Sequence, residues 1–147
     1  MQVTYSQHPE LGAGFTLQSV GIGPADLKWF KVIVQEQPRT SWEAVAEALG
    51  FESEEPAWDS NAPDPRLWSP GEKLVLWWMG PGTEFVHNLS TVYEEVYIEL
   101  CYCSLYGECW QTTIDTLVPW AVASCEPAPM VFERDRLPAL YEHPPKK

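Results

Sequence analysis

One short segment constrains the fold of this chain more than any other, because residues 41–50 show both ends of a helix. Thr40 or Ser41 is placed to cap its start, since a side-chain oxygen there can accept from the free N–H groups of the first turn. Gly50 takes the position at which a left-handed residue ends a helix. The apolar residues between these ends fall at helical spacing: Trp42, Val45, Ala46 and Leu49. The segment therefore predicts a compact helix with one buried face.

Strand patterns flank this helix on both sides. Residues 30–34 alternate between apolar and other side chains, as in a strand with one buried face. Residues 73–78 form an apolar run directly after the turn at Pro70-Gly71, and they predict a second strand. Residues 55–61 predict a second helix of one or two turns with Trp58 inward. The predicted order is strand, helix, helix, strand.

That order resembles the lysin-motif (LysM) family over residues 30–77. The helix of the family is matched by Trp42, Val45-Ala46 and Gly50-Phe51, and its second half by Asn61, Asp64-Pro65, Leu67-Trp68, Pro70-Gly71 and Leu74 to Leu76. The resemblance implies an α+β fold, with a LysM-like βααβ module and an additional, mainly β C-terminal hairpin unit. It covers about a third of the chain, and the half that contains Pro-Gly is the more specific part.

LysM domains bind glycans that contain N-acetylglucosamine, in a shallow groove between two loops. The glycan-binding positions that the resemblance implies are Arg39, Thr40, Ser41, Asn61, Ala62, Pro63 and Asp64. In the first loop the family has Gly-Asp-Thr where this chain has Arg39-Thr40-Ser41. Losing that glycine changes the backbone that would hydrogen-bond the acetamido groups.

The whole chain divides into segments by composition and turn signals. They are an N-terminal arm (1–27) with short strands at 3–6 and 15–20, the LysM-like module (28–79), a C-terminal unit (80–126) and a Pro-rich tail (127–147) with an edge strand at 130–132. Residues 92–120 fit a hairpin that turns at Gly107-Glu108, and they also fit a helix with Thr91 and Glu94 as its capping box. Their Val, Tyr, Ile, Thr and Trp content favours the hairpin.

The charge of the chain narrows its partners. The net charge of −12 argues against nucleic acid and anionic membranes, which a basic patch must neutralise, and it suits a basic protein partner. No apolar run reaches the roughly 18–20 residues of a membrane span. The start of the sequence lacks the pattern of a secretory signal, which predicts synthesis in the cytoplasm. A phage or injection particle is one route by which such a protein is delivered outside.

The residue patterns predict no enzymatic activity, no cofactor and no bound metal. The cysteines Cys101, Cys103, Cys109 and Cys125 are expected to be free thiols, because no secretion signal is present. With His87 they do not show the two-residue gap of zinc knuckles. Cys109, His87 and Asp115 can be written as a nucleophile set, but no local signature supports it.

Two functions from different classes follow. The first is a non-catalytic binding protein whose ligand is a glycan such as peptidoglycan. The second is a protein-interaction component that uses the LysM-like fold as a scaffold: a phage tail, baseplate or injection-system part, an adaptor, or an acidic inhibitor or immunity protein.

Overall fold

Two antiparallel sheets make up most of a computed structural model in which residues 1–8, 12–50, 58–80, 94–114, 116, 118–127 and 132 are described. The first sheet has four strands in the order β1, β2, β7, β5. Their bounds are Gln2–His8 (β1), Gly12–Gln18 (β2), Lys73–Met79 (β7) and Trp58–Ser60 (β5). The arm at the N-terminus is thus half of this sheet, because β1 and β2 pair along their whole length.

The second sheet has six strands and is built around β3, the longest one. One edge of β3 pairs with β8, followed by β9 and β10, and the other edge pairs with β4 and β6. The bounds are Ala25–Val34 (β3), Gln37–Arg39 (β4), Leu67–Trp68 (β6), Val96–Cys103 (β8), Cys109–Thr113 (β9) and Trp120–Val122 (β10).

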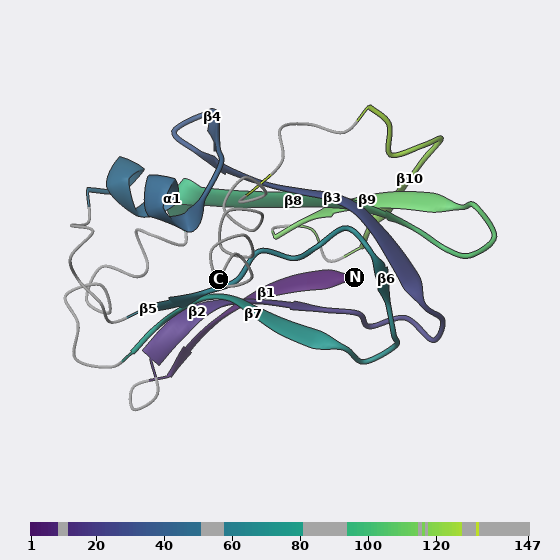
Figure 1. Ribbon diagram of the computed structural model, residues 1–147, viewed down its shortest axis with the longest axis horizontal. Coiled ribbons are helices and arrows are strands. Elements are labelled where there is room, and N and C mark those ends of the chain that lie inside the picture. Colours follow the sequence, from purple (N-terminus) through teal and green to yellow (C-terminus); the bar gives the residue numbers. More distant parts are fainter. Residues whose placement is uncertain are drawn as a thin grey trace, which may run out of the picture.

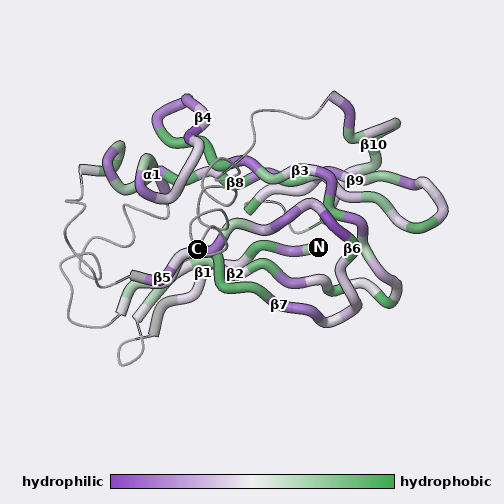
Figure 2. Tube along the Cα trace, viewed as in Figure 1, coloured by the Kyte–Doolittle hydropathy of each residue, from purple (hydrophilic) through white to green (hydrophobic). Residues whose placement is uncertain are grey.

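The sheets lie face to face with the main core between them (Figure 1). Because side chains alternate along a strand, every second residue of β8 enters this core: Val96, Ile98, Leu100 and Tyr102. Phe15 and Leu17 of β2 enter it from the first sheet. Figure 2 shows hydrophobic residues along β2, β3 and β8. The alternating pattern therefore produces a β-sandwich.

Helix α1 (Trp42–Ala48) lies at one end of the sandwich, beside the second sheet (Figure 1). A group of aromatic rings packs between the sheets at this end. Trp42 is fully buried and stacks on Trp77 of β7, with ring centroids 5.3 Å apart. Phe132 packs edge-on against Trp42 and against Phe30 of β3, at centroid distances of 5.1 and 5.4 Å. We call this group, Phe30, Trp42, Trp77 and Phe132, the closed end.

Two glycines, Gly12 and Gly14, let β2 approach β7 closely beside the closed end. A Cβ atom on Gly14 would lie 1.9 Å from the carbonyl oxygen of Trp77. On the neighbouring Gly12, which has a φ of 111°, it would lie 2.0 Å from the carbonyl oxygen of Met79. The pairing of these strands therefore requires glycine at both positions.

The predicted α+β fold with a βααβ module is wrong, because the protein is mainly β with one short helix among the described residues. The expected first and last strands are present within β3 and β7, but β3 pairs with β8 and β7 pairs with β2. Residues 58–60 of the expected second helix form β5, and residues 55–57 lie outside the described chain. Alternation shows which face of a strand is buried, but it does not identify the strand's partner.

Other local predictions are confirmed. The helix begins at Trp42, and Ser41 caps it by accepting from the Ala44 N–H at 3.1 Å. Residues 96–113 form the predicted hairpin, and Gly107 lies in its turn with a positive φ. Most of the expected Pro-rich tail and of the edge strand at 130–132 lies outside the described residues. No described helix is long and apolar enough to cross a membrane.

Candidate functional site

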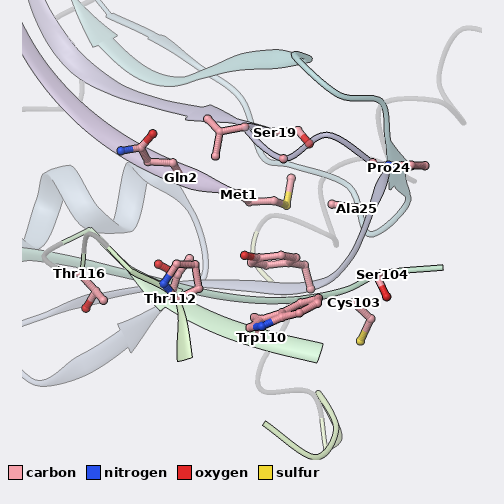
Figure 3. A pocket seen from close by; sticks show the side chains of 15 residues that line it. Met1, Gln2, Ser19, Pro24, Ala25, Cys103, Ser104, Trp110, Thr112 and Thr116 are labelled. Carbon is pink, nitrogen blue, oxygen red and sulfur yellow. The ribbon is translucent and has the colours of Figure 1, made fainter. Parts of the chain in front are cut away.

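The end of the sandwich away from α1 holds a pocket of about 360 Å³ (Figure 3). Met1 and Gln2 of the first sheet border it on one side, and Tyr102, Trp110 and Thr112 of the second sheet border it on the other. The connection from β2 to β3 also lines it through Ser19, Val20, Gly21, Gly23 and Pro24, together with Ala25, Thr116 and Pro119. We call this region the open end. A pocket remains there, whereas aromatic rings pack together at the closed end.

Two aromatic rings form the wall of the pocket on the second sheet. Tyr102 of β8 and Trp110 of β9 are directly paired across the two strands. Their rings stack with centroids 5.8 Å apart and an interplanar angle of 29°. Cross-strand aromatic pairs stabilise a sheet and hold each other's rotamers. The pair is therefore a rigid apolar surface against which a ligand can pack (Figure 3).

Ser19 is the most unusual polar group of the pocket. Its backbone is fixed to the turn before β7, because its N–H donates to the Glu72 carbonyl at 2.9 Å and its carbonyl accepts from Gly71 at 2.7 Å. Its side chain is 1% exposed, and the hydroxyl has no hydrogen-bond partner among the described residues. A buried hydroxyl without a partner costs about 1–3 kcal/mol. The folded protein therefore carries this cost beside the pocket.

The electrostatics of the pocket are close to neutral. None of the 15 lining residues has a charged side chain. Burial lowers the pKa of the Met1 amino group to about 6, so this group is mostly uncharged at neutral pH. Burial also raises the pKa of Tyr102, which keeps its phenol protonated. The site thus favours an uncharged, mainly apolar group.

Large exposed apolar side chains belong to the same chain segments as the residues that line the pocket. They come from the segments that border it and are exposed to solvent: Val20, Ile22, Leu105, Tyr106, Val118 and Trp120. We call them the apolar rim. Residues 18–25, 100–107 and 116–125 contain no charged residue, although the chain has a net charge of −12. Glu108 is the acidic residue closest in sequence to the exposed part of the β8–β9 turn. Exposed apolar residues that gather around a pocket are typical of a binding surface.

The first loop of the predicted glycan groove is used for internal contacts. The Arg39 guanidinium donates to the Val34 carbonyl at 3.0 Å and to the Gln35 side chain at 3.5 Å. Ser41 caps α1, and Thr40 is exposed. These residues hold the β4–α1 connection in place, and only Thr40 presents its side chain fully to solvent.

The second loop of that groove meets the first through Trp42. The Trp42 indole donates to the Asn61 carbonyl at 2.9 Å, and the Asn61 side chain donates to the Val75 carbonyl at 2.8 Å. Pro63 is buried, Ala62 is half-buried and Asp64 is exposed. Asn61 also borders a shallow hollow of about 490 Å³ on the edge of the first sheet, formed with Asp59, Ser60, Val75 and Trp78.

The expectation of free thiols is wrong, because the structure pairs all four cysteines. Cys101 is bonded to Cys125, and Cys103 to Cys109. All four lie on the outer face of the second sheet, away from the main core, with Trp29 and Val122 beside them. His87 and Asp115, the other members of the nucleophile set considered above, lie outside the described residues.

The open end combines residues that are far apart in the sequence, and sequence reasoning missed it for that reason. Met1, Ser19 and Trp110 meet only because β1, β2 and β9 are brought together by the sandwich. The sequence signal that could have indicated the open end is the set of three segments without charged residues, in a chain with a net charge of −12. No protein-family model, curated protein or solved structure matches the chain.

Proposed function

We propose that this protein is a non-catalytic binding protein whose open end receives an apolar side chain of a basic protein partner. The observation that carries the proposal is the unfilled, charge-free pocket bordered by the apolar rim. The proposal keeps the protein-interaction role predicted from the sequence, but it moves that role from a LysM-like scaffold to the end of a β-sandwich.

The size of the pocket suits one anchoring side chain. A volume of about 360 Å³ is at the lower end of the range for ligand sites and has room for a Leu, Phe or Trp side chain. Fully burying such a side chain contributes about 1.5–3 kcal/mol, and stacking on Tyr102 and Trp110 adds to that.

The apolar rim surrounds this anchor. At protein interfaces a few buried anchors supply most of the binding energy, and the contacts around them exclude water. Val20 lines the pocket, and the exposed side chains of Ile22, Leu105 and Tyr106 are within two residues in sequence of residues that line it, so we propose that role for them. A single small ligand inside the pocket would leave these side chains in water, so the rim favours a protein partner over a small molecule.

The charge of the chain indicates the character of the partner. With a net charge of −12, the protein attracts a basic partner over a distance and repels an acidic one. Long-range attraction acts on the rate of association and is screened by salt, while the uncharged pocket acts on the lifetime of the complex. The two regions therefore serve different steps of the same binding event.

The disulfides bear on where this binding takes place. Disulfides persist in oxidising environments and are rare where cellular thiols keep cysteines reduced. Two of them in so short a chain support action outside the cytoplasm, which agrees with the delivery by a phage or injection particle considered from the sequence. This location is part of the proposal.

The proposal is tested with a synthetic peptide of Lys and Gly residues around one central Phe, compared with the same peptide containing Gly at that position. We expect the Phe peptide to quench or shift the Trp fluorescence saturably, and its affinity to fall as salt rises. Trp110→Ala should weaken binding about tenfold or more, which corresponds to the loss of one stacked aromatic contact. Trp29→Ala, on the outer face of the same sheet, is the matched control.

Binding of both peptides with equal affinity would contradict the proposal, since charge alone would then account for it. Phe-peptide binding that is unchanged in Trp110→Ala would also contradict it, because the anchor would then lie elsewhere.

A glycan remains the second candidate, at the hollow that Asn61 borders. There Trp78 is half-buried beside the polar side chains of Asp59, Ser60 and Asn61, and an aromatic ring next to hydrogen-bonding groups suits a sugar ring. Titration with chitooligosaccharides tests it. Saturable binding that Trp78→Ala abolishes and Trp110→Ala leaves intact would support the glycan. No binding at millimolar oligosaccharide would exclude it.

A further inference from the structure

We propose that the four cysteines, once reduced, form a tetrathiolate site for Zn²⁺ on the outer face of the second sheet. This inference is independent of the partner proposed for the open end. It starts from the way in which strand geometry gathers the sulfur atoms. Cys101 and Cys103 are two residues apart on β8 and therefore point to the same face of the sheet.

The other two cysteines approach from different segments. Cys109 begins β9 and is directly paired with Cys103. Cys125 comes from the segment after β10, and its carbonyl accepts from the Trp29 indole at 2.7 Å, which fixes this segment over the sheet. All four cysteines are buried, between 0% and 8% exposed. Four potential ligands thus converge from three segments that separate contacts hold in place.

The distances between sulfur atoms already resemble those around a metal ion. The Sγ atoms of Cys103 and Cys125, which are not bonded to each other, lie 3.7 Å apart. Four sulfur atoms placed tetrahedrally about Zn²⁺ at about 2.3 Å lie about 3.8 Å from one another. The Sγ atoms of Cys103, Cys109 and Cys125 all lie within 4.8 Å of each other, and that of Cys101 lies outside this group of three. Once its bond to Cys125 is broken, the Cys101 side chain must rotate toward the other three sulfur atoms to complete the tetrahedron.

The surroundings can accept such a centre. Zn²⁺ with four thiolates has a net charge of −2, which needs nearby cationic or dipolar groups. A hollow of about 380 Å³ adjoins the cluster, and its lining includes one cationic side chain, Lys28, one acidic side chain, Glu126, and the dipolar groups of Trp29 and Ser124. Lys28 also forms an ion pair with Asp26 at 2.8 Å, so it offsets only part of the charge of such a centre. The closed set of four thiolates indicates a structural metal and not a catalytic one.

Reduction of the two disulfides must precede zinc binding. Each disulfide takes two electrons and two protons from one dithiol reductant, which becomes a cyclic disulfide, so two reductant molecules yield four thiols. Zn²⁺ then binds four thiolates and displaces their four protons, because cysteine thiols are mostly protonated at neutral pH. In a cell, the thiol pool of the cytoplasm supplies the reductant, and the oxidised protein outside that compartment has the two disulfides instead.

The test uses the full chain, reduced with a phosphine reductant without oxygen and titrated with Zn²⁺ against a chromogenic chelator. We expect one Zn²⁺ per chain with a Kd of about 50 nM or tighter, the range of structural zinc sites. Co²⁺ in place of Zn²⁺ should give the intense visible absorption of a tetrahedral thiolate complex. Cys103→Ser should weaken binding by more than the roughly 10–100-fold that loss of an outer-shell contact costs. Thr40→Ala, at an exposed position beside α1, should leave it unchanged.

Two results would overturn the inference. One is a reduced chain that is folded by circular dichroism and binds no stoichiometric Zn²⁺. The other is Zn²⁺ binding that Cys103→Ser and Cys125→Ser leave unchanged. If reduction unfolds the chain, refolding on addition of Zn²⁺ supports the site, and binding of Zn²⁺ without recovery of β structure overturns it.

Discussion

Both ends of the sandwich lie between the same two sheets, but aromatic rings pack together at the closed end and a pocket remains at the open end. At the closed end, Trp42 reaches from α1 between the sheets and contacts Trp77, Phe30 and Phe132. At the open end, Tyr102 and Trp110 stack only on one wall, and a pocket of about 360 Å³ remains beside them. Aromatic residues occur at both ends, so composition does not distinguish them.

The difference lies in how the space at each end is filled. At the closed end the Trp42 indole donates to Asn61, and Trp42 packs against the rings of Trp77 and Phe132. At the open end a buried hydroxyl on Ser19 lacks a partner, and six large apolar side chains face solvent. Groups left unsatisfied in this way lower stability, and they persist at sites that bind something. The comparison therefore places stability at one end and binding at the other.

Truncation of the central ring at the closed end is expected to have the largest effect. Trp42→Ala should lower the free energy of unfolding by about 3–5 kcal/mol, because it leaves a large cavity among packed rings. Trp110→Ala at the open end should cost less than half as much, since its ring is half-buried beside an existing space. Urea unfolding at fixed pH measures both. Equal losses would remove the distinction between the two ends.

A glycine pair sharpens the same contrast in the backbone. Gly14→Ala should cost about 1–3 kcal/mol, because the new methyl group would overlap the Trp77 carbonyl. Gly23→Ala, at the open end, has no atom within 4 Å of the new Cβ and should change stability by no more than about 0.5 kcal/mol. Thermal unfolding of the two variants under the same conditions gives the comparison. A large loss of stability in Gly23→Ala would contradict the contrast, because it would mean that atoms pack closely around Gly23.

Ser19 gives an effect of the opposite sign. Ser19→Ala should raise the free energy of unfolding by about 1 kcal/mol, because it removes a buried hydroxyl that has no partner. The control is Thr113→Val in β9, which should lower it by about 1 kcal/mol, because the Thr113 hydroxyl is hydrogen-bonded to Thr116 at 2.8 Å. If Ser19→Ala destabilised the protein as much as Thr113→Val, the hydroxyl would have a partner in the free protein.

The smallest expected effect is a pH dependence from the open end. The Met1 amino group has a pKa of about 6 in the folded chain and an ordinary value of 8.0, so folding disfavours its charged form. Its contribution to stability is therefore complete above pH 8 and declines as the pH falls from 8 to 6. Acetylation of the amino group should remove this part of the pH dependence. Unfolding curves at pH 6 and pH 8, with and without acetylation, measure it, and identical pH dependences would contradict the buried amine.

The local elements of this fold were accessible from the sequence, whereas their arrangement was not. The helix at Trp42 and the hairpin around Gly107 depend on neighbouring residues: a cap, an apolar stripe, a turn glycine. The pairing of β3 with β8 joins residues about 70 positions apart, and no local pattern specifies it. The resemblance to LysM joined β3 and β7 through a correct helix and a correct Pro-Gly turn, and it placed them in one module although they belong to different sheets.

The same limit applies to the site. A positive signal for the open end was present in the charge-free segments around Ile22, Leu105 and Val118. Whether those segments meet depends on which strands are neighbours in the two sheets, and this is a long-range property. The cysteines differ from that case. Cys101 and Cys103 share a face by simple alternation, but their bonding to Cys125 and Cys109 requires the path of the chain after β10.

The most direct test of the account is to map where an apolar anchor binds. Amide chemical shifts of the labelled protein are followed by NMR as the Lys- and Gly-flanked Phe peptide is added, with the Gly peptide as reference. The account predicts that the Phe-specific changes are concentrated on Ser19, Ala25, Tyr102 and Trp110, and that α1 and Trp77 stay unchanged. Phe-specific changes centred on α1 or on the hollow beside Asn61, with none around Trp110, would contradict it.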